Sequence, residues 1–192
     1  MKPLILGSSS PFRREILGKL GVPFTTRSPE VDETPLPGEQ PEALVQRLAL
    51  IKATAVAEHN PDSLIIASDQ VSVLDEIISG KPGNHRKAIE QLTKCSGKTV
   101  TFYTGLCLYD TTARNYQLDC ELFKVHFKTL TDRMIENYVN REKPYQCAGS
   151  FKSEGLGITL INALEGRDPN ALIGLPLIRL TEMLALKGMA LP

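Results

Sequence analysis

Residues 4–17 read LILGSSSPFRREIL, and the rest of the chain can be organised around this stretch. An apolar run ends at Gly7, three serines follow, and Pro11 opens a segment with the spacing of a helix. Ser10 is a suitable N-cap, and proline is well tolerated in the first helical turn, where its missing N–H needs no partner. The stretch therefore predicts a β-strand that leads into an α-helix through small residues.

A junction of this kind also predicts an anion site. The first turn of a helix presents unpaired backbone N–H groups and the positive end of the helix dipole. Arg13 and Arg14 would add positive charge within that turn. Many α/β proteins bind nothing at such a junction, and the stretch lacks both the Walker loop and the GxGxxG fingerprint. Phosphate binding here is therefore a hypothesis that needs support from elsewhere in the chain.

Composition limits the classes of partner. The 192 residues suffice for one domain with a sizeable core, which we place over residues 1–192. Lysine plus arginine and aspartate plus glutamate both total 22, so a nucleic acid or an anionic membrane is not an expected partner. The four cysteines show no CxxC spacing, no apolar run approaches the ~18 residues of a membrane span, and the first residues do not resemble a signal peptide. We expect a cytoplasmic protein with free thiols.

The remaining sequence predicts a mixture of strands and helices, which is typical of an α/β protein. The run over 63–68 is almost wholly apolar, as expected of a strand that is covered on both faces. Asn84 and Thr131 are expected N-caps. After the opening strand and helix, the expected elements are an extended segment over 22–26, a loop over 28–40, a helix over 41–60, a strand over 63–68, a segment over 77–83 that is rich in turn residues at 79–83, a helix over 84–95, a hairpin over 98–128, a helix over 131–141, a glycine-spaced loop over 146–157, a strand over 158–164 and a helix over 170–186.

Four charged residues occupy positions that could face a ligand. Glu33 lies in the 28–40 loop, and Lys52 lies beside the apolar stripe of the 41–60 helix. Asp69 follows the buried strand, at the kind of strand exit where α/β sheets bind ligands. Lys81 is held between a glycine and a proline. Each residue also has a plain structural explanation, as a solvated charge or a turn cap.

Together with Ser8, Arg13 and the 146–155 loop, these four residues suit the hydrolysis of a phosphoanhydride. Cations hold a polyphosphate and offset the charge that develops in the transition state. One carboxylate can help to bind a divalent ion, while the other orients or deprotonates the attacking water.

Seven short blocks, taken in order, carry a family resemblance. They are LGSSSPFRREIL (6–17), VDE (31–33), RLA followed by KA (47–53), SDQV (68–71), GKP (80–82), YTG (103–105) and IGLP (173–176). In this order the blocks resemble the Maf family of nucleoside triphosphate pyrophosphatases over essentially the whole chain. The resemblance implies an elongated, two-lobed, ITPase-like α/β fold, with a mixed twisted sheet flanked by helices and a central cleft.

The same resemblance implies a reaction and a set of roles. Water would split a nucleoside triphosphate at the α–β phosphoanhydride into the monophosphate and pyrophosphate, with Mg²⁺, Mn²⁺ or Co²⁺ as the divalent cation. By position, Asp69 would be the general base, and Glu33 would bind the metal with it. The implied phosphate ligands are Ser8, Arg13, Lys52 and Lys81. Homodimers are common in this family.

Three positions bear on the choice of base. Phe12, Gln70 and Glu154 stand where the pyrimidine-specific branch of the family usually has Arg, Thr and Gln, at the base end of the family's pocket. A carboxylate can accept hydrogen bonds from guanine N1–H and its exocyclic amine. A cationic 7-methylguanine would be attracted to Glu154 and would stack on Phe12. In these positions the chain resembles the YceF-like branch, which prefers 7-methyl-GTP; alternatively, Phe12 merely packs and Glu154 is solvated.

The resemblance therefore implies a house-cleaning pyrophosphatase that acts on 7-methyl-GTP or another modified purine nucleotide. Two other functions stay open from the sequence. One is a pyrophosphatase for dTTP and UTP, and the other is a nucleotide-binding regulator of cell division without significant catalysis.

Overall fold

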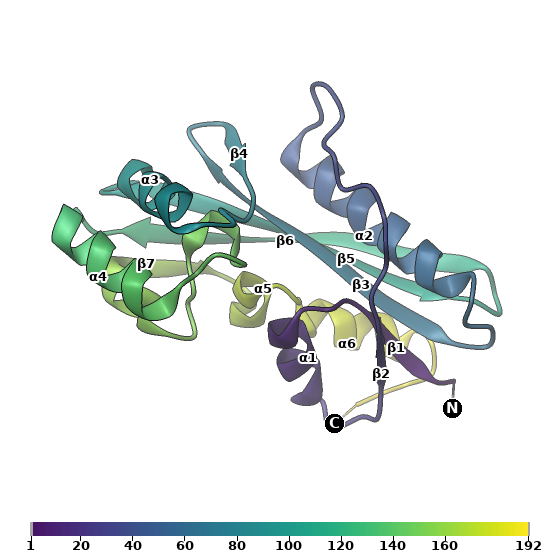
Figure 1. The fold of residues 1–192 in the computed structure, drawn as a ribbon. Coiled ribbons are helices and arrows are strands. Elements are labelled where there is room, and N and C mark those ends of the chain that lie inside the picture. Colours follow the sequence, from purple (N-terminus) through teal and green to yellow (C-terminus); the bar gives the residue numbers. More distant parts are fainter. Residues whose placement is uncertain (1, 192) are drawn as a thin grey trace. The chain divides into compact units, whose positions relative to one another are not determined.

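The computed structural model describes residues 2–191 (Figure 1). Its elements, in chain order, are β1 (Leu4–Gly7), α1 (Pro11–Gly18), β2 (Thr25–Arg27), α2 (Pro41–Ala57), β3 (Leu64–Leu74), β4 (Ile77–Ser79), α3 (His85–Cys95), β5 (Thr99–Asp110), β6 (Asn115–Phe127), α4 (Asp132–Glu142), the 3₁₀ helices η1 (Ala148–Ser150) and η2 (Leu156–Leu160), β7 (Ile161–Gly166), α5 (Pro169–Ile173) and α6 (Leu177–Ala185). The chain divides into two compact units, and each is described by itself. Unit 1 is Met1–Asp69, Thr104–Glu121 and Asp168–Pro192, and unit 2 is Gln70–Tyr103 and Leu122–Arg167.

In unit 1, β1 and the first part of β3 are covered by helices on both faces, because successive side chains of a strand point in opposite directions. Leu6 and Ile66 belong to a buried cluster with residues of α1 and α6. Ile5 and Ile65 belong to a second cluster with residues of α2. Figure 1 shows α2 on one side of β3 and α6 on the other. The apolar character of residues 63–68 thus has the predicted cause.

The strands form a mixed sheet. In unit 1, β1 pairs in parallel with β2 and with β3. In unit 2, β4 pairs antiparallel with β3, and β7 pairs antiparallel with β6. The hydrogen-bonded order is β2-β1-β3-β5-β6-β7, with β4 attached to β3. The hairpin predicted over 98–128 corresponds to the neighbouring strands β5 and β6, and the expected α/β class is confirmed.

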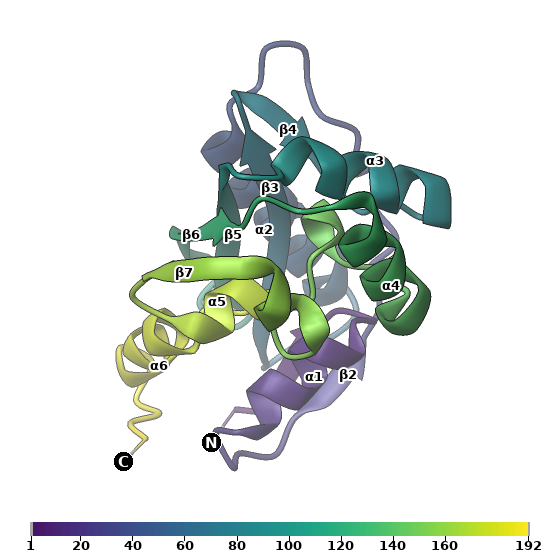
Figure 2. The ribbon, with the colours of Figure 1, turned by 90° about the vertical axis from the view of Figure 1, so that its left-hand side faces the viewer.

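Unit 2 packs around aromatic side chains. The ring of Phe151 lies 6.2 Å from that of Phe102 and 5.4 Å from that of Phe127, measured between centroids. Helices α3 and α4 contact each other and lie side by side (Figure 2). The buried side of α4 consists of Ile135, Tyr138 and Val139. Phe151 therefore anchors the middle of the glycine-spaced loop in the core of this unit.

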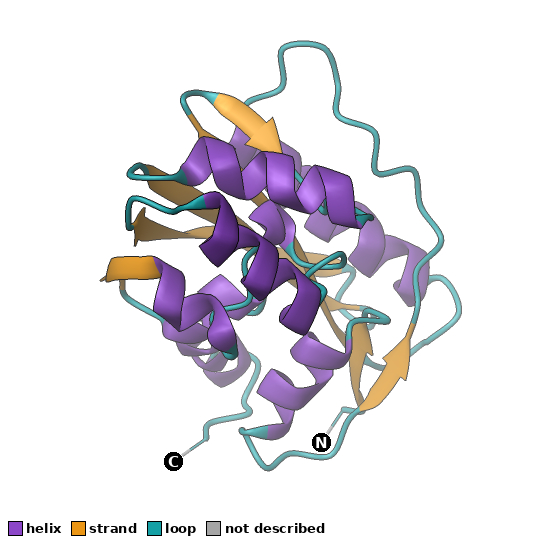
Figure 3. Ribbon diagram, turned by 60° about the vertical axis from the view of Figure 1, so that its left-hand side comes forward, coloured by secondary structure: helices purple, strands orange, loops and turns teal. Residues whose placement is uncertain are grey.

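The predicted helix starts are confirmed by their caps. The side chains of Ser10, Asn84 and Thr131 each accept a hydrogen bond from the backbone N–H three residues later, at 3.0–3.3 Å. The long segment between β2 and α2 is a loop, as expected (Figure 3). Within residues 2–191, no helix is long and apolar enough to cross a membrane.

Two elements near the C-terminus are present, but their predicted bounds are wrong. The strand expected over 158–164 begins only at Ile161, because the chain first makes the 3₁₀ turns of η2, where Thr159 Oγ1 donates to the Leu156 carbonyl at 2.7 Å. The helix expected over 170–186 is two helices, α5 and α6. Gly174 ends α5 with φ at +123°, a conformation that glycine adopts most readily, and Pro176 precedes α6.

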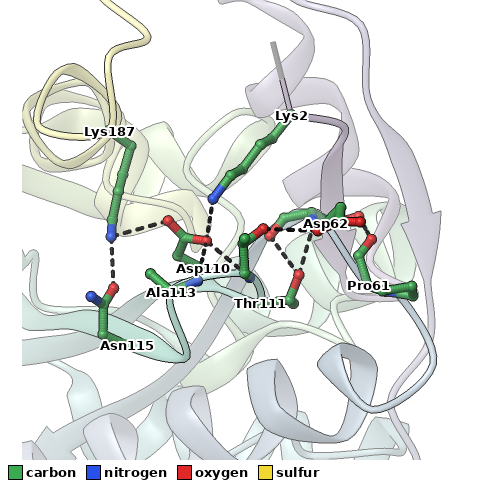
Figure 4. Close-up of polar contacts among 10 residues, drawn as sticks. Lys2, Pro61, Asp62, Asp110, Thr111, Ala113, Asn115 and Lys187 are labelled. Atoms are coloured by element: carbon green, nitrogen blue, oxygen red, sulfur yellow. Dashed lines mark hydrogen bonds and ion pairs between the residues drawn. The ribbon is translucent and has the colours of Figure 1, made fainter.

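A buried carboxylate joins both ends of the described chain in unit 1. Asp110 Oδ1 accepts from Lys2 Nζ at 2.5 Å and from the backbone N–H of Ala113 at 3.1 Å (Figure 4). Asp110 Oδ2 lies 3.3 Å from Lys187 Nζ, which also donates to Asn115 at 2.6 Å. Burial alone would raise the pKa of Asp110, but these hydrogen bonds and the charge of Lys187 lower it to about 2.

Candidate active site

The strand-to-helix junction forms as predicted in unit 1. Ser8 follows β1 and is buried, and its Oγ accepts from the backbone N–H of Ser10 at 3.1 Å. Ser10 then caps α1, whose first residue is Pro11. The turn therefore fixes two hydroxyls beside the first turn of a helix, and the dipole of that helix favours an anion there.

The central feature of unit 1 is a lysine between two carboxylates. Lys52 Nζ lies 2.6 Å from Asp69 Oδ1 and 2.9 Å from Glu33 Oε1. Lys52 and Asp69 are buried, whereas 57% of the Glu33 side chain is exposed. A buried ammonium is tolerated when carboxylates compensate its charge. Lys52 is therefore part of the buried side of α2, and not a residue at its margin as the sequence suggested.

Asp69 does not stand at a strand exit, and that prediction is wrong. It lies within β3, which continues to Leu74 because Ser72 to Leu74 pair with the residues of β4. Asp69 is the last residue of this stretch of unit 1. Its carboxylate is held from α2 through Lys52 and not by a turn at the end of the strand.

Arg13 is brought close to the same carboxylates. Its Nε donates to the carbonyl oxygen of Gly174 at 2.8 Å. Burial lowers the pKa of the Arg13 guanidinium, and the negative charges of Asp69 and Glu33 act in the opposite direction. Arginine remains protonated at neutral pH even so. Unit 1 thus gathers two cations and two carboxylates, with Ser8 and Ser10 at the start of the helix that carries Arg13.

The loop that carries Glu33 is fastened to α2 by a second cation. Arg47 donates from Nε and Nη2 to the two carboxylate oxygens of Glu39, at 2.6 and 2.7 Å. Arg47 Nη2 also donates to the carbonyl oxygen of Thr34 at 3.2 Å. The hydrogen bond from Arg47 lowers the pKa of Glu39 to about 2. Because Thr34 follows Glu33 directly, Arg47 restrains the backbone beside that carboxylate.

Unit 2 joins the Lys81 turn to the glycine-spaced loop. The carbonyl oxygen of Gly80 accepts from the backbone N–H of Gly149 at 3.2 Å, and the Tyr145 carbonyl accepts from Gly83 N at 3.0 Å. Lys81 itself is exposed. Burial raises the pKa of the Cys147 thiol to about 11; the charge of Glu154 acts in the same direction, and that of Lys81 opposes it. Lys81 and Glu154 therefore both lie within electrostatic reach of Cys147.

Helix α4 fastens the rest of that loop. Glu142 accepts from Lys152 Nζ at 3.0 Å and from the backbone N–H of Leu156 at 2.7 Å. Tyr138 donates its hydroxyl to the Ser150 carbonyl at 3.2 Å and accepts from Lys152 N at 2.9 Å. The loop is thus held on both sides of Glu154, which is exposed.

Comparison with known proteins gives the family. The sequence profile described as "Maf-like protein" matches residues 3–186. The chain belongs to the Maf family. A 7-methyl-GTP pyrophosphatase of Nitrosococcus oceani is 57% identical over 96% of this chain and 93% of its own length. A protein of the same name from Colwellia psychrerythraea is 56% identical over 98% of this chain and 94% of its own. A solved HAM1 protein from Coxiella burnetii aligns over 66% of this chain and 73% of its own at 14% identity and a TM-score of 0.48, which is too distant to bear on the site.

The residues predicted for this Maf chain fall in both units. Unit 1 brings together Ser8, Arg13, Glu33, Lys52 and Asp69, and also contains Phe12, which lies on α1 and is partly buried. Unit 2 contains Gln70, which follows Asp69 in β3, together with Lys81 and Glu154. The catalytic, phosphate-binding and base-selecting roles of these residues stay predictions.

Two carboxylates of the site, those of Glu33 and Asp69, could contribute ligands to a divalent cation. Among residues 2–191, no group of three or more His, Cys, Asp or Glu side chains is placed to hold a metal ion. Glu33 and Asp69 nevertheless share one ammonium, so their carboxylates lie near each other. Mg²⁺ is commonly bound through one or two carboxylates together with substrate phosphates. The two residues therefore suit a cation that arrives with a triphosphate.

Several residues of the site were not singled out from the sequence. Arg47 and Ser68 each stood in a recognised block without a role of their own, and Glu39 and Glu142 carried no signal. Gly174 did carry one, because a glycine two residues before a proline is a strong helix-ending pattern.

Proposed function

We propose that this Maf protein is a nucleoside triphosphate pyrophosphatase that hydrolyses 7-methyl-GTP to 7-methyl-GMP and pyrophosphate. The observation that carries the proposal is 57% identity over 96% of the chain to a relative named 7-methyl-GTP pyrophosphatase. The cluster of Arg13, Lys52, Glu33 and Asp69 supports the reaction class, because phosphoryl transfer depends mainly on placed charges.

In the proposed reaction, Asp69 orients a water molecule and accepts its proton as the water oxygen attacks the α-phosphorus. The bond from the α-phosphorus to the bridging oxygen breaks, and pyrophosphate leaves. Arg13 and Lys81 hold phosphate oxygens, while Ser8 and the first turn of α1 donate hydrogen bonds to them. Lys52 keeps the Asp69 carboxylate in place and adds positive charge near the developing negative charge.

A divalent cation belongs to the same proposal. Glu33 and Asp69 would hold Mg²⁺, Mn²⁺ or Co²⁺, and the bound ion would supply charge neutralisation to the phosphate oxygens. A cytoplasmic location, a house-cleaning role and a homodimer are also proposed, and size-exclusion chromatography with light scattering tests the last of these.

The choice of a methylated purine rests on Phe12, Gln70 and Glu154. A carboxylate attracts the positively charged 7-methylguanine and accepts from its N1–H and amine groups. A phenyl ring at position 12 can stack on a cationic base, whereas an arginine there would repel it.

The test is a panel of 7-methyl-GTP, GTP, dTTP and UTP with pyrophosphate detection, run with each of the three cations. Purified Asp69→Asn protein serves as the control for contaminating phosphatases. We expect the highest kcat/KM for 7-methyl-GTP. Faster turnover of dTTP or UTP would favour a pyrimidine pyrophosphatase instead, and the absence of turnover with all four would favour a binding role.

A further inference from the structure

The carbonyl oxygen of Gly174 accepts two hydrogen bonds from side chains that are far apart in the sequence. Arg13 Nε donates to it at 2.8 Å, and Ser68 Oγ donates to it at 2.9 Å. A backbone carbonyl has two lone pairs, so both donors can be accommodated. Ser68 is fully buried and directly precedes Asp69 in β3. One backbone atom thus connects the helix of Arg13 to the strand of Asp69, within unit 1.

The position of this carbonyl is fixed by its own segment. The backbone N–H of Gly174 donates to the carbonyls of Asn170 and Ala171 at 3.1 and 3.0 Å. Asp168, which is fully buried, accepts from the backbone N–H groups of Asn170 and Ile178, both at 2.8 Å. The carboxylate therefore ties the start of α5 to the start of α6, on either side of Gly174. The segment around Gly174 is therefore internally rigid, and the Ser68 hydroxyl joins it to β3.

Glycine is needed at this place. The φ of +123° lies in a region that other residues rarely adopt, and an added Cβ would lie 3.3 Å from Arg13 Nε. The IGLP block at residues 173–176 therefore has a physical reason that the proposed reaction alone does not supply.

We propose that Ser68 and the Gly174 carbonyl are positioning groups that hold the Arg13 guanidinium in a fixed relation to the Asp69 carboxylate. The inference rests on the proposed function, in which Arg13 binds phosphate and Asp69 activates water. Asp69 is already held from α2 by Lys52, whereas Arg13 Nε is held by this carbonyl. Ser68, next to Asp69, donates to the same carbonyl and so fixes the position of Asp69 relative to Arg13.

The expected consequence concerns kcat more than KM. Charges attract a triphosphate even when they are slightly displaced, but attack on the α-phosphorus requires an aligned water and phosphate. Small misplacements of reacting groups can lower rates by up to about 100-fold. For Ser68→Ala we expect kcat to fall about tenfold, with KM for 7-methyl-GTP changed by less than about threefold.

The chain offers a matched control in Thr104. Thr104 is also buried, and its Oγ1 donates at 3.0 Å to the carbonyl of Ala171 in α5, the helix that Gly174 ends. Thr104→Val therefore removes a buried hydroxyl from the same segment without touching the Gly174 carbonyl. We expect a similar decrease in melting temperature for both variants, but a kcat close to wild type for Thr104→Val. Ser68→Cys, which keeps the shape and a weaker donor, should give an intermediate kcat and covers the case in which Ser68→Ala folds poorly.

A double-mutant cycle with Arg13→Ala shows whether Ser68 acts through Arg13. If it does, Ser68→Ala should lower kcat by less than about twofold in the Arg13→Ala background. Equal kcat values for Ser68→Ala and Thr104→Val, or multiplicative effects of Ser68→Ala and Arg13→Ala on kcat, would overturn the inference. The proposed function would still stand in that case, provided that the wild-type protein hydrolyses 7-methyl-GTP. A wild-type protein that hydrolyses no triphosphate would overturn both.

Discussion

The Lys52 ammonium donates to Asp69 Oδ1 at 2.6 Å, and both residues are buried. One residue comes from the middle of α2 and the other from β3. Removing one partner of a buried ion pair leaves the other charge without compensation, which costs more than the pair contributes when intact. The exposed Glu33 carboxylate, 2.9 Å from the same ammonium, limits that cost for Lys52 when Asp69 is changed.

Asp69→Asn should abolish most hydrolysis while leaving the fold intact. The amide keeps the size of the side chain but cannot accept the proton of water, and general-base catalysis is worth roughly 10²–10⁴-fold in rate. We expect kcat for 7-methyl-GTP to fall by about that factor, with a cooperative thermal transition retained. The measurements are pyrophosphate release and calorimetric unfolding.

Asp75→Asn is the matched control for this variant. Asp75 pairs with Lys98 at 2.5 Å, but both side chains are about half exposed, and the pair lies in unit 2. Its loss should leave kcat unchanged, since exposed ion pairs contribute little. Wild-type turnover by Asp69→Asn would remove Asp69 from the proposed role.

Local sequence chemistry predicted the elements of the site better than their arrangement. Ser10 and Pro11 predicted the start of α1, and apolar runs predicted β1 and β3. These signals can be read from the sequence because a cap or an apolar run involves only neighbouring residues. The break between α5 and α6 was also available from Gly174 and Pro176, and it was missed because the apolar spacing continues across it.

The contacts that unite the site were not available in that way. Arg13 and Gly174 are 161 positions apart, and the acceptor is a backbone carbonyl that no side-chain pattern marks. The burial of Lys52 likewise depends on Asp69, which lies 17 residues further on. The sequence of the helix alone therefore does not distinguish a buried lysine from a solvated one. Apart from the family resemblance, the sequence therefore does not predict which distant residues contact each other in the site.

Arg47→Lys should loosen the loop that carries Glu33. Lysine replaces the planar fork by a single point charge, so it cannot hold both oxygens of Glu39 and the Thr34 carbonyl together. We expect hydrogen exchange across residues 33–39 to become several-fold faster and the Mg²⁺ concentration for half-maximal activity to rise. Arg86→Lys, in an exposed pair with Glu90, is the control that should change neither quantity.

The contact between Arg47 and Glu39 should depend on pH. The hydrogen bond from Arg47 lowers the pKa of Glu39 from 4.5 to about 2. A carboxylate with a depressed folded-state pKa stabilises the fold above its unfolded pKa, and that contribution is lost as the pH falls towards the folded value. After correction for the intrinsic exchange rate at each pH, the protection factors of the wild-type loop should therefore fall below about pH 4.5 more steeply than those of Arg47→Lys. Parallel pH profiles for the two proteins would contradict the assignment.

Asp110→Asn should destabilise unit 1 without affecting catalysis. The buried carboxylate accepts from Lys2 and Ala113 and faces Lys187 (Figure 4). Hydrogen bonds to a charged group contribute about 1.5–3 kcal/mol, so we expect a loss of about 2 kcal/mol at pH 7 in denaturant unfolding. Because the pKa of Asp110 is lowered from 3.8 to about 2, the difference between variant and wild type should shrink as the pH falls below 4. A difference that does not depend on pH would show that the charge is not its cause.

Glu154→Gln should weaken the preference for a methylated base. In the proposed function, the amide removes the negative charge that attracts 7-methylguanine and places an N–H donor where guanine itself presents donors. A lost hydrogen bond to a charged group corresponds to roughly tenfold or more in binding. We therefore expect the ratio of kcat/KM for 7-methyl-GTP over GTP to fall about tenfold, chiefly through KM for the methylated nucleotide. Glu165→Gln is the control, because Glu165 is an exposed carboxylate of the same unit that pairs with Lys124 at 2.9 Å. An unchanged ratio in Glu154→Gln, or an equal loss in Glu165→Gln, would mean that Glu154 is merely solvated and that the base is chosen elsewhere.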